Sequence, residues 1–384
     1  MSWMQTSLGE VVDLKRGFDL PASERVDGPY SVYSSSGQTG THTAPAVEGP
    51  CVITGRYGTI GNVYFSADAC WPLNTSLYST DFKGNNPRFV YHLLKMVPWR
   101  EYTTASAVPG INRNHVNLCP VRIPDLETQA AIAFILDSLG SKIAANAKLN
   151  GYLAVQCEAI AERATGENTV LESLCDLVTE KADCSEADFD TYVSTESLLP
   201  NKMGRQIASS LPQTGKVTVY QAGDILISNI RPYFKKIWYA DQAGTCSGDV
   251  LVFRAKQPEW AGYLYSCLRN DSFFDFVMKG AKGTKMPRGD KKQMLTYEVS
   301  ASPNQLVIGF MASALKHIST ANKESEHLAA LRDALLPKLM SGEVDVSKVN
   351  LTQLNSHLPH LGRSRIYRFS VDAESYSPLS KMHN

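Results

Sequence analysis

The sequence lacks the short patterns by which many enzymes are identified. It has no GxxxxGK[ST] phosphate loop, no GxSxG nucleophile motif and no HExxH zinc motif. It also lacks the Asn-Pro-Pro-aromatic tetrapeptide of amino-methyltransferases, and Pro124-Asp125 is not followed by the acidic-x-Lys triplet of a nuclease core. Gly58-Thr59-Ile60-Gly61 is followed by a strand-like segment instead of a helix, so it does not indicate a dinucleotide site. We therefore expect no catalytic residue, no metal site and no cofactor on this chain.

The chain also lacks a net charge and paired cysteine motifs. Its 38 basic and 38 acidic residues balance, whereas a nucleic-acid-binding protein that acts alone is usually basic. Any contact with nucleic acid must then come from local patches or from basic partners. The eight cysteines include no CxxC pair, which is typical of reduced thiols in a cytoplasmic protein and not of a disulfide framework or zinc site.

Long apolar runs are missing as well. No stretch of about 18 consecutive apolar residues is present, so we expect no transmembrane helix. The N-terminal residues MSWMQTSLGE have neither a basic region nor an apolar core, which argues against a signal peptide. The predicted location is the cytoplasm, with no membrane as partner.

A long amphipathic helix is the strongest positive signal in the sequence. In residues 127–165, the following positions alternate in steps of four and three: Ile132, Leu136, Leu139, Ile143, Asn146, Asn150, Leu153, Cys157 and Ile160. This is the a/d seam of a coiled coil, sustained over about four heptads. One continuous helix of roughly 57 Å is expected at about 1.5 Å per residue. Such a helix cannot bury its seam alone and needs a partner helix.

The partner helix lies in the same chain, at residues 304–342. Gln129 aligns with Gln305, Ile132 with Ile308, and the same offset continues to Asn146 and Asn322. Each long helix follows a globular segment, and the two segments present similar elements in the same order. This pattern indicates an internal duplication, with a period far longer than that of a solenoid repeat.

The predicted fold class is α+β, with two tandem α/β domains separated by two long antiparallel coiled-coil helices related by a pseudo-two-fold repeat. The boundaries are a first domain at 1–125, a first helix at 126–166, a second domain at 167–302 and a second helix at 303–342. Residues 343–384 are polar and lose the periodicity, so we expect a largely irregular tail.

The most basic stretch of the chain is the loop at 279–293. It combines glycines with Lys282, Lys285, Arg288, Lys291 and Lys292, and it holds a single acidic residue. Flexible cationic side chains suit phosphate contact with release of counterions, so we predict phosphate contact here. The alternative is a solvated loop without a ligand.

A second basic segment occupies the turn after the expected strand at 223–227. Its candidate DNA-binding residues are Arg231, Tyr233, Lys235 and Lys236. The alternative is a hairpin whose aromatic side chains point into the core, and the sequence does not decide between the two.

Six side chains of the first segment have the chemistry to read base edges: Arg56, Tyr57, Asn62, Asn112, Arg113 and Asn114. Arginine pairs with guanine and asparagine with adenine through bidentate hydrogen bonds. For each residue considered alone, a role in stabilising a turn is the alternative. Asn146, Asn150 and Asn322 lie on the helix seams, where they either set the register of the helix pair or mark a seam open to solvent or to another subunit.

The chain to about Gly342 resembles the specificity subunit of a type I restriction–modification system. The resemblance rests on the tandem layout and on local phrases. These phrases are the glycine-rich turn GRYGTIG at 55–61, the helix start IPDLETQ at 123–129 and the helix end LLPKLMSGE at 335–343. Asn229-Ile230-Arg231-Pro232 stands where the second segment would repeat the glycine-rich turn.

The resemblance implies the function and the partners. Each globular segment would be a target-recognition domain that reads one half of a split site in double-stranded DNA. Two modification subunits would dock on the helices and carry out adenine methylation that depends on S-adenosylmethionine. Two restriction subunits would add motor and nuclease activity that depends on ATP and Mg²⁺. This chain would be non-catalytic.

Two other classes of protein remain open from the residues alone. One is a helical-hairpin adaptor whose globular segments bind protein and have no DNA specificity. The other is an enzyme of unrecognised chemistry, such as a hydrolase built around the loop that carries Ser34 and Ser36. Charge reversal in the basic loop would leave DNA affinity unchanged in an adaptor, and purified enzyme would turn over a substrate alone.

Overall fold

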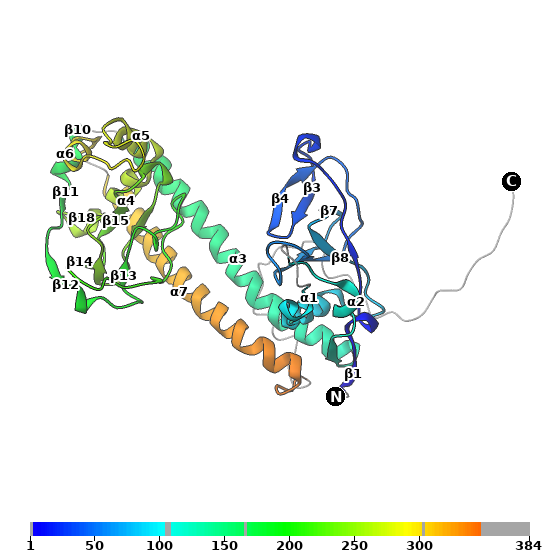
Figure 1. The fold of residues 1–384 in the computed structure, drawn as a ribbon. Coiled ribbons are helices and arrows are strands. Elements are labelled where there is room, and N and C mark those ends of the chain that lie inside the picture. The colour runs from blue at the N-terminus through cyan, green and yellow to red at the C-terminus, as the bar shows by residue number, and fades with distance from the viewer. Residues whose placement is uncertain (1–2, 104–108, 165–166, 302–303, 347–384) are drawn as a thin grey trace. The chain divides into compact units, whose positions relative to one another are not determined.

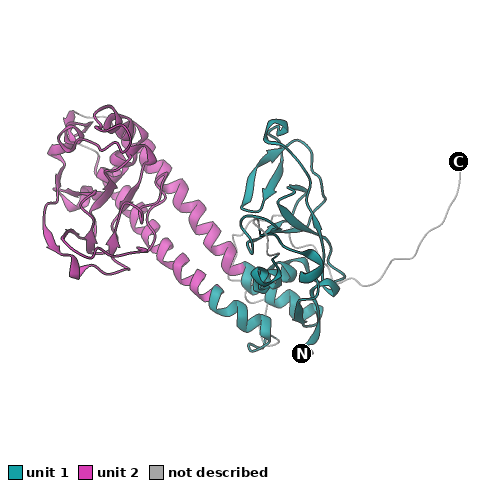
Figure 2. Ribbon diagram, viewed as in Figure 1, with its two compact units in different colours: residues 1–137, 333–384 teal, residues 138–332 magenta. Residues whose placement is uncertain are grey.

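The computed structural model describes residues 3–103, 109–164, 167–301 and 304–346 of the chain (Figure 1). It divides into two compact units (Figure 2). Unit 1 comprises residues 1–137 and 333–384, and unit 2 comprises residues 138–332. Each unit therefore contains one globular lobe and a part of both long helices.

The lobe of unit 1 is built from short sheets that are antiparallel except for the parallel pairing of β3 (Tyr30–Ser34) with β7 (Cys70–Pro72). Strands β2 (Asp13–Arg16), β8 (Ser76–Asp81), β5 (Cys51–Gly55) and β6 (Val63–Ser66) form a four-stranded sheet in that order. A second sheet has the order β4 (Gly37–His42), β3 (Tyr30–Ser34) and β7 (Cys70–Pro72). Strand β1 (Met4–Ser7) pairs with β9 (Pro120–Ile123). The central strand β5 is buried along its whole length, as its apolar and β-branched residues favour.

The core of unit 1 joins the sheet to the helices. Helix α1 (Pro87–Met96) begins at Asn86, whose side chain accepts from the N–H groups of Arg88 and Phe89. Helix α3 (Leu126–Glu162) contributes Ile132 and Leu136 to this core, each 1 % exposed. The end of helix α7 (Gln305–Ser341) contributes Leu339, also 1 % exposed. Full burial of each such side chain stabilises the fold by about 1.5–3 kcal/mol.

The lobe of unit 2 repeats the four-stranded sheet and the outer strand pair of unit 1, whereas its second sheet has four strands where that of unit 1 has three. Its four-stranded sheet has the order β11 (Cys175–Leu177), β18 (Val250–Ala255), β15 (Ile225–Ser228) and β16 (Ile237–Tyr239). The second sheet has the order β12 (Lys181–Asp183), β14 (Lys216–Tyr220), β17 (Gly244–Cys246) and β13 (Tyr192–Val193). Strand β10 (Asn168–Val170) pairs with β19 (Glu298–Ser300), as β1 pairs with β9. In each of these two pairs, the first strand is followed directly by a short 3-10 helix. These helices are Leu8–Glu10 after β1 and Leu171–Ser173 after β10.

Three short helices complete this lobe. Helix α4 (Ala261–Arg269) has the place that α1 has in unit 1, and α6 (Lys291–Leu295) has that of α2 (Arg113–Val116). Helix α5 (Asp271–Lys279) was not expected from the sequence. Its apolar residues Phe273, Phe274 and Val277 lie on one helical face, and Asn270 caps its N-terminus. The segment is too short for a periodic pattern to stand out.

Helices α3 and α7 each span 37 residues, so both predicted long helices are present. The predicted seam positions of α3 are all buried or half-buried in the unit to which each belongs. Within unit 2, Asn146 bonds to Ala321 and Asn150 to Ile318, so residue numbers rise along one helix as they fall along the other. The two helices are therefore antiparallel in this unit (Figure 1).

Helix α3 is also the one helix among the described residues that is long and apolar enough to cross a membrane by length and composition. Its most apolar window has a mean hydropathy of 1.2, and 28 % of that window is buried. Helices in the cores of non-membrane proteins meet the same criterion. The expectation of no membrane span therefore stays a prediction.

The described part of the predicted tail is short. Residues 343–346 follow α7 without regular secondary structure, and Val346 is 3 % exposed in the core of unit 1. The rest of the tail lies outside the described residues, as does Pro303 at the start of the predicted second helix.

Candidate nucleic-acid interface

In unit 1, two loops that are distant in sequence are joined by their backbones. The turn after β5 carries Arg56 and Tyr57, and the loop before α2 carries Gly110 and Ile111. Tyr57 forms a β-bridge with Gly110, and the Ile111 N–H donates to the Arg56 carbonyl at 3.0 Å. A Cβ atom on Gly110 would lie 2.2 Å from Cε1 of Tyr57. Glycine at this position therefore lets the Tyr57 ring pack directly against the second loop.

This junction forms a pocket of about 360 Å³. Its lining residues are Arg16, Arg56, Tyr57, Leu77, Gly110, Ile111, Asn112, Arg113 and Asn114. The structure thus brings together every first-segment candidate except Asn62. The Nδ2 atom of Asn62 donates to the hydroxyl of Tyr64 at 3.1 Å, which stabilises its own hairpin.

The side chains around the pocket are held by local contacts. The guanidinium of Arg56 lies 4.5 Å from the centre of the Tyr57 ring, in cation–π geometry. Oδ1 of Asn112 accepts from the Asn114 N–H at 3.1 Å and caps α2. Nη1 of Arg113 donates to the Leu14 carbonyl at 3.4 Å.

Arg16 is a pocket residue that was not predicted from the sequence. It is the last residue of β2, and β2 lies beside β8, which in turn pairs with β5. The pairing of these strands therefore carries Arg16 to the turn that follows β5. The only local signal was the basic pair Lys15-Arg16 at the end of a short strand.

Unit 2 contains the same junction with different side chains. The turn after β15 and the loop before α6 are joined by a β-bridge between Ile230 and Arg288. The Arg231 N–H donates to the Pro287 carbonyl at 2.8 Å. Asp290 caps α6, as Asn112 caps α2, and each cap lies three residues after a proline. These loops are equivalent by sequence order, and the structure gives them the same position in each lobe.

The basic loop of unit 2 is exposed. Lys282 is 82 % exposed at its side chain and lies 3.1 Å from Asp290, whose pKa is lowered mainly by that hydrogen bond. Arg288 lies 3.1 Å from Asp249 and its side chain is 56 % exposed. Lys285, Lys291 and Lys292 are exposed and form no ion pair with any described residue. The ion pairs of Lys282 and Arg288 lie at the surface and contribute little to stability. These five basic side chains of the loop therefore remain available to a ligand.

Some side chains of the turn at 229–236 are exposed, and others contact the rest of unit 2. Tyr233 is 47 % exposed and packs on Phe234, with 4.6 Å between ring centres. Lys235 pairs with Asp271 at 2.9 Å, and Nζ of Lys236 donates to the Thr195 carbonyl at 2.5 Å. Burial lowers the pKa of Lys236. These two lysines thus make internal contacts, whereas Tyr233 faces outward.

A strained cluster ties this turn to helix α3. Asn201, Lys202, Arg231 and Lys235 all have left-handed backbones, with φ of 55°, 63°, 50° and 51°. The N–H groups of Asn201 and Lys202 donate to the carbonyls of Phe234 and Lys235 at 2.8 and 2.9 Å. Lys202 also reaches Glu158 of α3 at 2.9 Å. Non-glycine residues in this conformation cost of order 1–3 kcal/mol each, and such strain persists where surrounding contacts enforce it.

Glu158 is the residue through which the cluster holds α3. Besides Lys202, it accepts from Nε of Arg269 at 2.6 Å. Arg269 in turn donates to the Lys202 carbonyl at 2.7 Å. The side chains of all three residues are mostly buried. The two cations share the Glu158 carboxylate, and Lys202 also pairs with Asp271 at 2.8 Å. No sequence signal points to this cluster, since its members come from separate elements.

Asn146 and Asn150 of the α3 seam are buried in unit 2, whereas Asn322 of α7 is exposed. Nδ2 of Asn146 donates to Oε2 of Glu324 at 2.7 Å, and Asn146 is 6 % exposed. Nδ2 of Asn150 donates to Oδ1 of Asn322 at 2.8 Å. These contacts join α3 to α7, as expected if the asparagines set the register of the helix pair.

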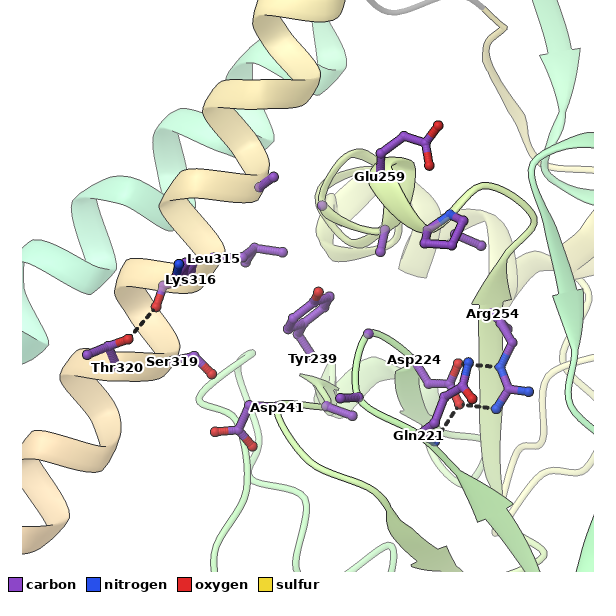
Figure 3. A pocket seen from close by; sticks show the side chains of 18 of the residues that line it. Gln221, Asp224, Tyr239, Asp241, Arg254, Glu259, Leu315, Lys316, Ser319 and Thr320 are labelled. Carbon is purple, nitrogen blue, oxygen red and sulfur yellow. Dashed lines mark hydrogen bonds and ion pairs between the residues drawn. The ribbon is translucent and has the colours of Figure 1, made fainter.

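A larger cavity of about 720 Å³ lies between the lobe of unit 2 and α7. Figure 3 shows Gln221, Asp224 and Arg254 on the lobe, and Lys316, Ser319 and Thr320 on the helix. Asp224 is 1 % exposed and accepts two hydrogen bonds of 2.7 Å from Arg254. The charges of Asp224 and Arg254 therefore satisfy each other.

The structure gives no support to a hydrolytic site at Ser34. Its hydroxyl contacts that of Ser36 at 2.9 Å and the Gly37 carbonyl at 3.3 Å, and neither contact is with a general base. Among the described residues, no cluster of three or more His, Cys, Asp or Glu side chains could hold a metal ion.

Comparisons with known proteins were made for the whole chain. Residues 1–153 match a family model described as the type I restriction modification DNA specificity domain. A search of curated protein sequences returned no match. Among solved structures, the chain is similar to the S subunit of a type I restriction-modification system from M. genitalium. The TM-score is 0.57 with 15 % identity, over 88 % of this chain and 96 % of that one. This likeness shows a shared fold.

Two further structures resemble the chain more weakly. One is the HsdS subunit from Thermoanaerobacter tengcongensis, with a TM-score of 0.33 and 14 % identity over 89 % of this chain and 97 % of that one. The other comes from a study of complex assembly and conformational transition of the type I R-M system. Its TM-score is 0.39 at 14 % identity, over 89 % of this chain and 98 % of that one.

Proposed function

We propose that the chain is the DNA sequence-specificity subunit of a type I restriction–modification complex, because residues 1–153 match the type I restriction modification DNA specificity domain. In this role it reads a bipartite target in double-stranded DNA and scaffolds the other subunits. It acts in the cytoplasm.

The observation that carries the proposal is the repeated loop junction. Each lobe joins the turn after one strand of its four-stranded sheet to a proline-containing loop that caps a short helix. Both junctions are closed by a β-bridge and a backbone hydrogen bond between the two loops, while their side chains differ. Two recognition loops on a common scaffold suit a protein that reads two different half-sites. The lobes are then target-recognition domains.

The long helices serve as spacer and docking platform in this proposal. Their antiparallel pairing in unit 2 supports a pseudo-two-fold chain, in which the helices set the gap between the half-sites. Two modification subunits bind the helical region and use S-adenosylmethionine to methylate adenine. Restriction subunits supply ATP- and Mg²⁺-dependent motor and nuclease activity. The chain itself contributes recognition and no catalysis.

Charge reversal in the basic loop tests the proposal against the helical-hairpin adaptor. Replacing Lys282, Lys285, Lys291 and Lys292 by glutamate should weaken DNA binding of the purified complex and make its salt dependence shallower. The log–log slope should fall by about 0.9 for each phosphate that the variant no longer neutralises. An adaptor without DNA specificity would show the same DNA affinity before and after the change.

A further inference from the structure

We propose that the pocket formed by Arg16, Arg56 and Arg113 receives one phosphate of the DNA backbone and does not read a base. The proposal rests on the proposed function and assigns the contact made by unit 1. It also changes the role expected for Arg56, Asn112, Arg113 and Asn114, which were predicted from the sequence to read base edges.

The charge of the pocket is the first argument. Three arginines are among its lining residues, and the described lining residues include no carboxylate. Asp19 lies 3.7 Å from Arg16, but its side chain is 73 % exposed and does not belong to the lining. A concave site with several cations and no anion is matched by a phosphate, which carries one negative charge and only acceptor oxygens.

The direction of the hydrogen bonds is the second argument. Bidentate recognition of adenine by asparagine needs the side-chain oxygen to accept and the nitrogen to donate. In Asn112 the oxygen already accepts from the Asn114 N–H at 3.1 Å. What Asn112 offers to a ligand is therefore its Nδ2 donor. The arginines are donors only, so the polar side chains around the pocket mainly supply donors.

Shape is the third argument. Base edges lie at the floor of a groove, where protruding side chains reach them. Phosphates project from the duplex, so a hollow in the protein surface meets a phosphate before it meets a base. A volume of about 360 Å³ accommodates the phosphate with its flanking sugar atoms.

The backbone around the pocket is fixed, which the binding of a single group requires. The N–H groups of Arg56 and Tyr57 both donate to the Thr75 carbonyl, at 2.9 and 3.2 Å. The Ile111 N–H holds the Arg56 carbonyl from the opposite side. Because Arg56 also stacks on Tyr57, its guanidinium is positioned before a ligand arrives.

The test removes charge first from the arginines of the protein and then from the phosphates of the DNA. Arg16→Gln, Arg56→Gln and Arg113→Gln are made singly in the full chain, with Lys15→Gln as the matched control. Lys15 is exposed and adjacent to Arg16, but it does not line the pocket. Complexes with the modification subunits are titrated with target and scrambled duplexes over a range of salt. A methylphosphonate, which is an uncharged phosphate analogue, is then placed at each position of the target.

The phosphate contact predicts a specific pattern. Each arginine variant should lose about tenfold in affinity for target and scrambled DNA alike, with a salt slope shallower by about 1 and an unchanged sequence preference. Lys15→Gln should lose less. One methylphosphonate position should weaken the wild-type complex and have little further effect on the Arg56→Gln complex. That position should be found with wild-type protein, so the test does not depend on the folding of any variant.

Other results would overturn the inference. Relaxed preference at one base pair with an unchanged salt slope would make these arginines base readers. Sensitivity to an abasic nucleotide without sensitivity to any methylphosphonate would mean that the pocket holds an extruded base. In both cases the proposed function stands. If the wild-type complex shows no preference for any duplex, the proposed function fails as well.

Discussion

Nε2 of His92 lies 2.8 Å from Oδ1 of Asp137, a contact that joins α1 to α3 inside unit 1. Burial lowers the pKa of His92 despite the neighbouring carboxylate. Burial by itself would raise the pKa of Asp137, but hydrogen bonds from His92 and Arg88 outweigh it, and the net pKa is lowered. A neutral imidazole that donates to a carboxylate is the arrangement consistent with both directions.

This contact predicts that the anchoring of α1 weakens in acid. His92 in the unfolded chain takes up a proton near pH 6.5, while in the folded chain its pKa is lower. Its contribution to stability is therefore present above about pH 6.5 and is lost as the pH falls through the folded pKa. Asp137 adds a second loss at more acidic pH, below about 3.8. The protection of α1 amides against hydrogen exchange, corrected for the intrinsic exchange rate at each pH, should fall between pH 7 and pH 5 in wild type, and less so in His92→Gln. Equal pH dependence in both would contradict this assignment.

Gly110→Ala should disrupt the junction of unit 1. The added Cβ would meet the Tyr57 ring at 2.2 Å, so the ring must move and Arg56 loses its stacking partner. DNA affinity of the complex should fall about tenfold, which corresponds to about 1.4 kcal/mol, while the melting temperature changes little. Gly248→Ala is the control, because a Cβ there has no neighbour within 4 Å. Unchanged affinity in Gly110→Ala would separate this junction from DNA binding.

Two lysines of unit 2 should behave differently, although both are candidate DNA-binding residues by sequence. Lys235 pairs with Asp271 at 2.9 Å, whereas Lys292 is exposed and forms no ion pair with a described residue. Lys292→Gln should make the salt dependence of DNA binding shallower, and Lys235→Gln should leave the slope unchanged. Salt titrations of the two variants decide the point. If the salt dependence became equally shallow in both variants, Lys235 would contact DNA as Lys292 does, which would contradict this prediction.

A carboxylate at position 146 should force α3 and α7 apart in unit 2. Asn146 donates to Glu324 at 2.7 Å, so Asn146→Asp removes the donor and sets two carboxylates together. A loss of about 1–3 kcal/mol is expected at pH 7, with recovery in acid as a carboxylate takes up a proton.

Asn150→Asp is the milder matched variant. The partner of Asn150 is the amide of Asn322, 2.8 Å away, which can rotate and donate to a carboxylate. Melting temperatures of the two variants at pH 7 and pH 4.5 would reveal the difference. Equal losses at pH 7, without recovery at pH 4.5, would contradict the pairing seen between the helices.

The sequence predicts those features that depend on local pattern. The seam of α3 could be found because alternating steps of three and four bring Ile132, Asn146 and Cys157 to one helical face. The proline loops could be paired because Asn112 and Asp290 follow prolines at the same spacing. The family resemblance is confirmed for residues 1–153 by the family model.

Features built by tertiary contact were missed for a physical reason. Arg16 reaches Arg56 through the pairing of β2, β8 and β5, and no local periodicity encodes the order of strands in a sheet. Lys235 was predicted to contact DNA because it lies in a basic segment. In the structure it forms an ion pair with Asp271, which belongs to helix α5, and α5 was not expected from the sequence. The charge of a loop residue indicates which kinds of group its side chain can bind. It does not reveal whether that group belongs to a ligand or to another part of the same chain.

The central claim is that this chain directs adenine methylation to one split DNA motif. The most direct test maps adenine methylation across the genome of the source cell, with the gene intact, deleted, and restored as wild type or as the four-lysine glutamate variant. Deletion should abolish methylation at one bipartite motif, wild type should restore it, and the variant should restore less. Methylation that is unchanged by deletion, in a cell where the chain co-purifies with an active methyltransferase, would contradict this claim.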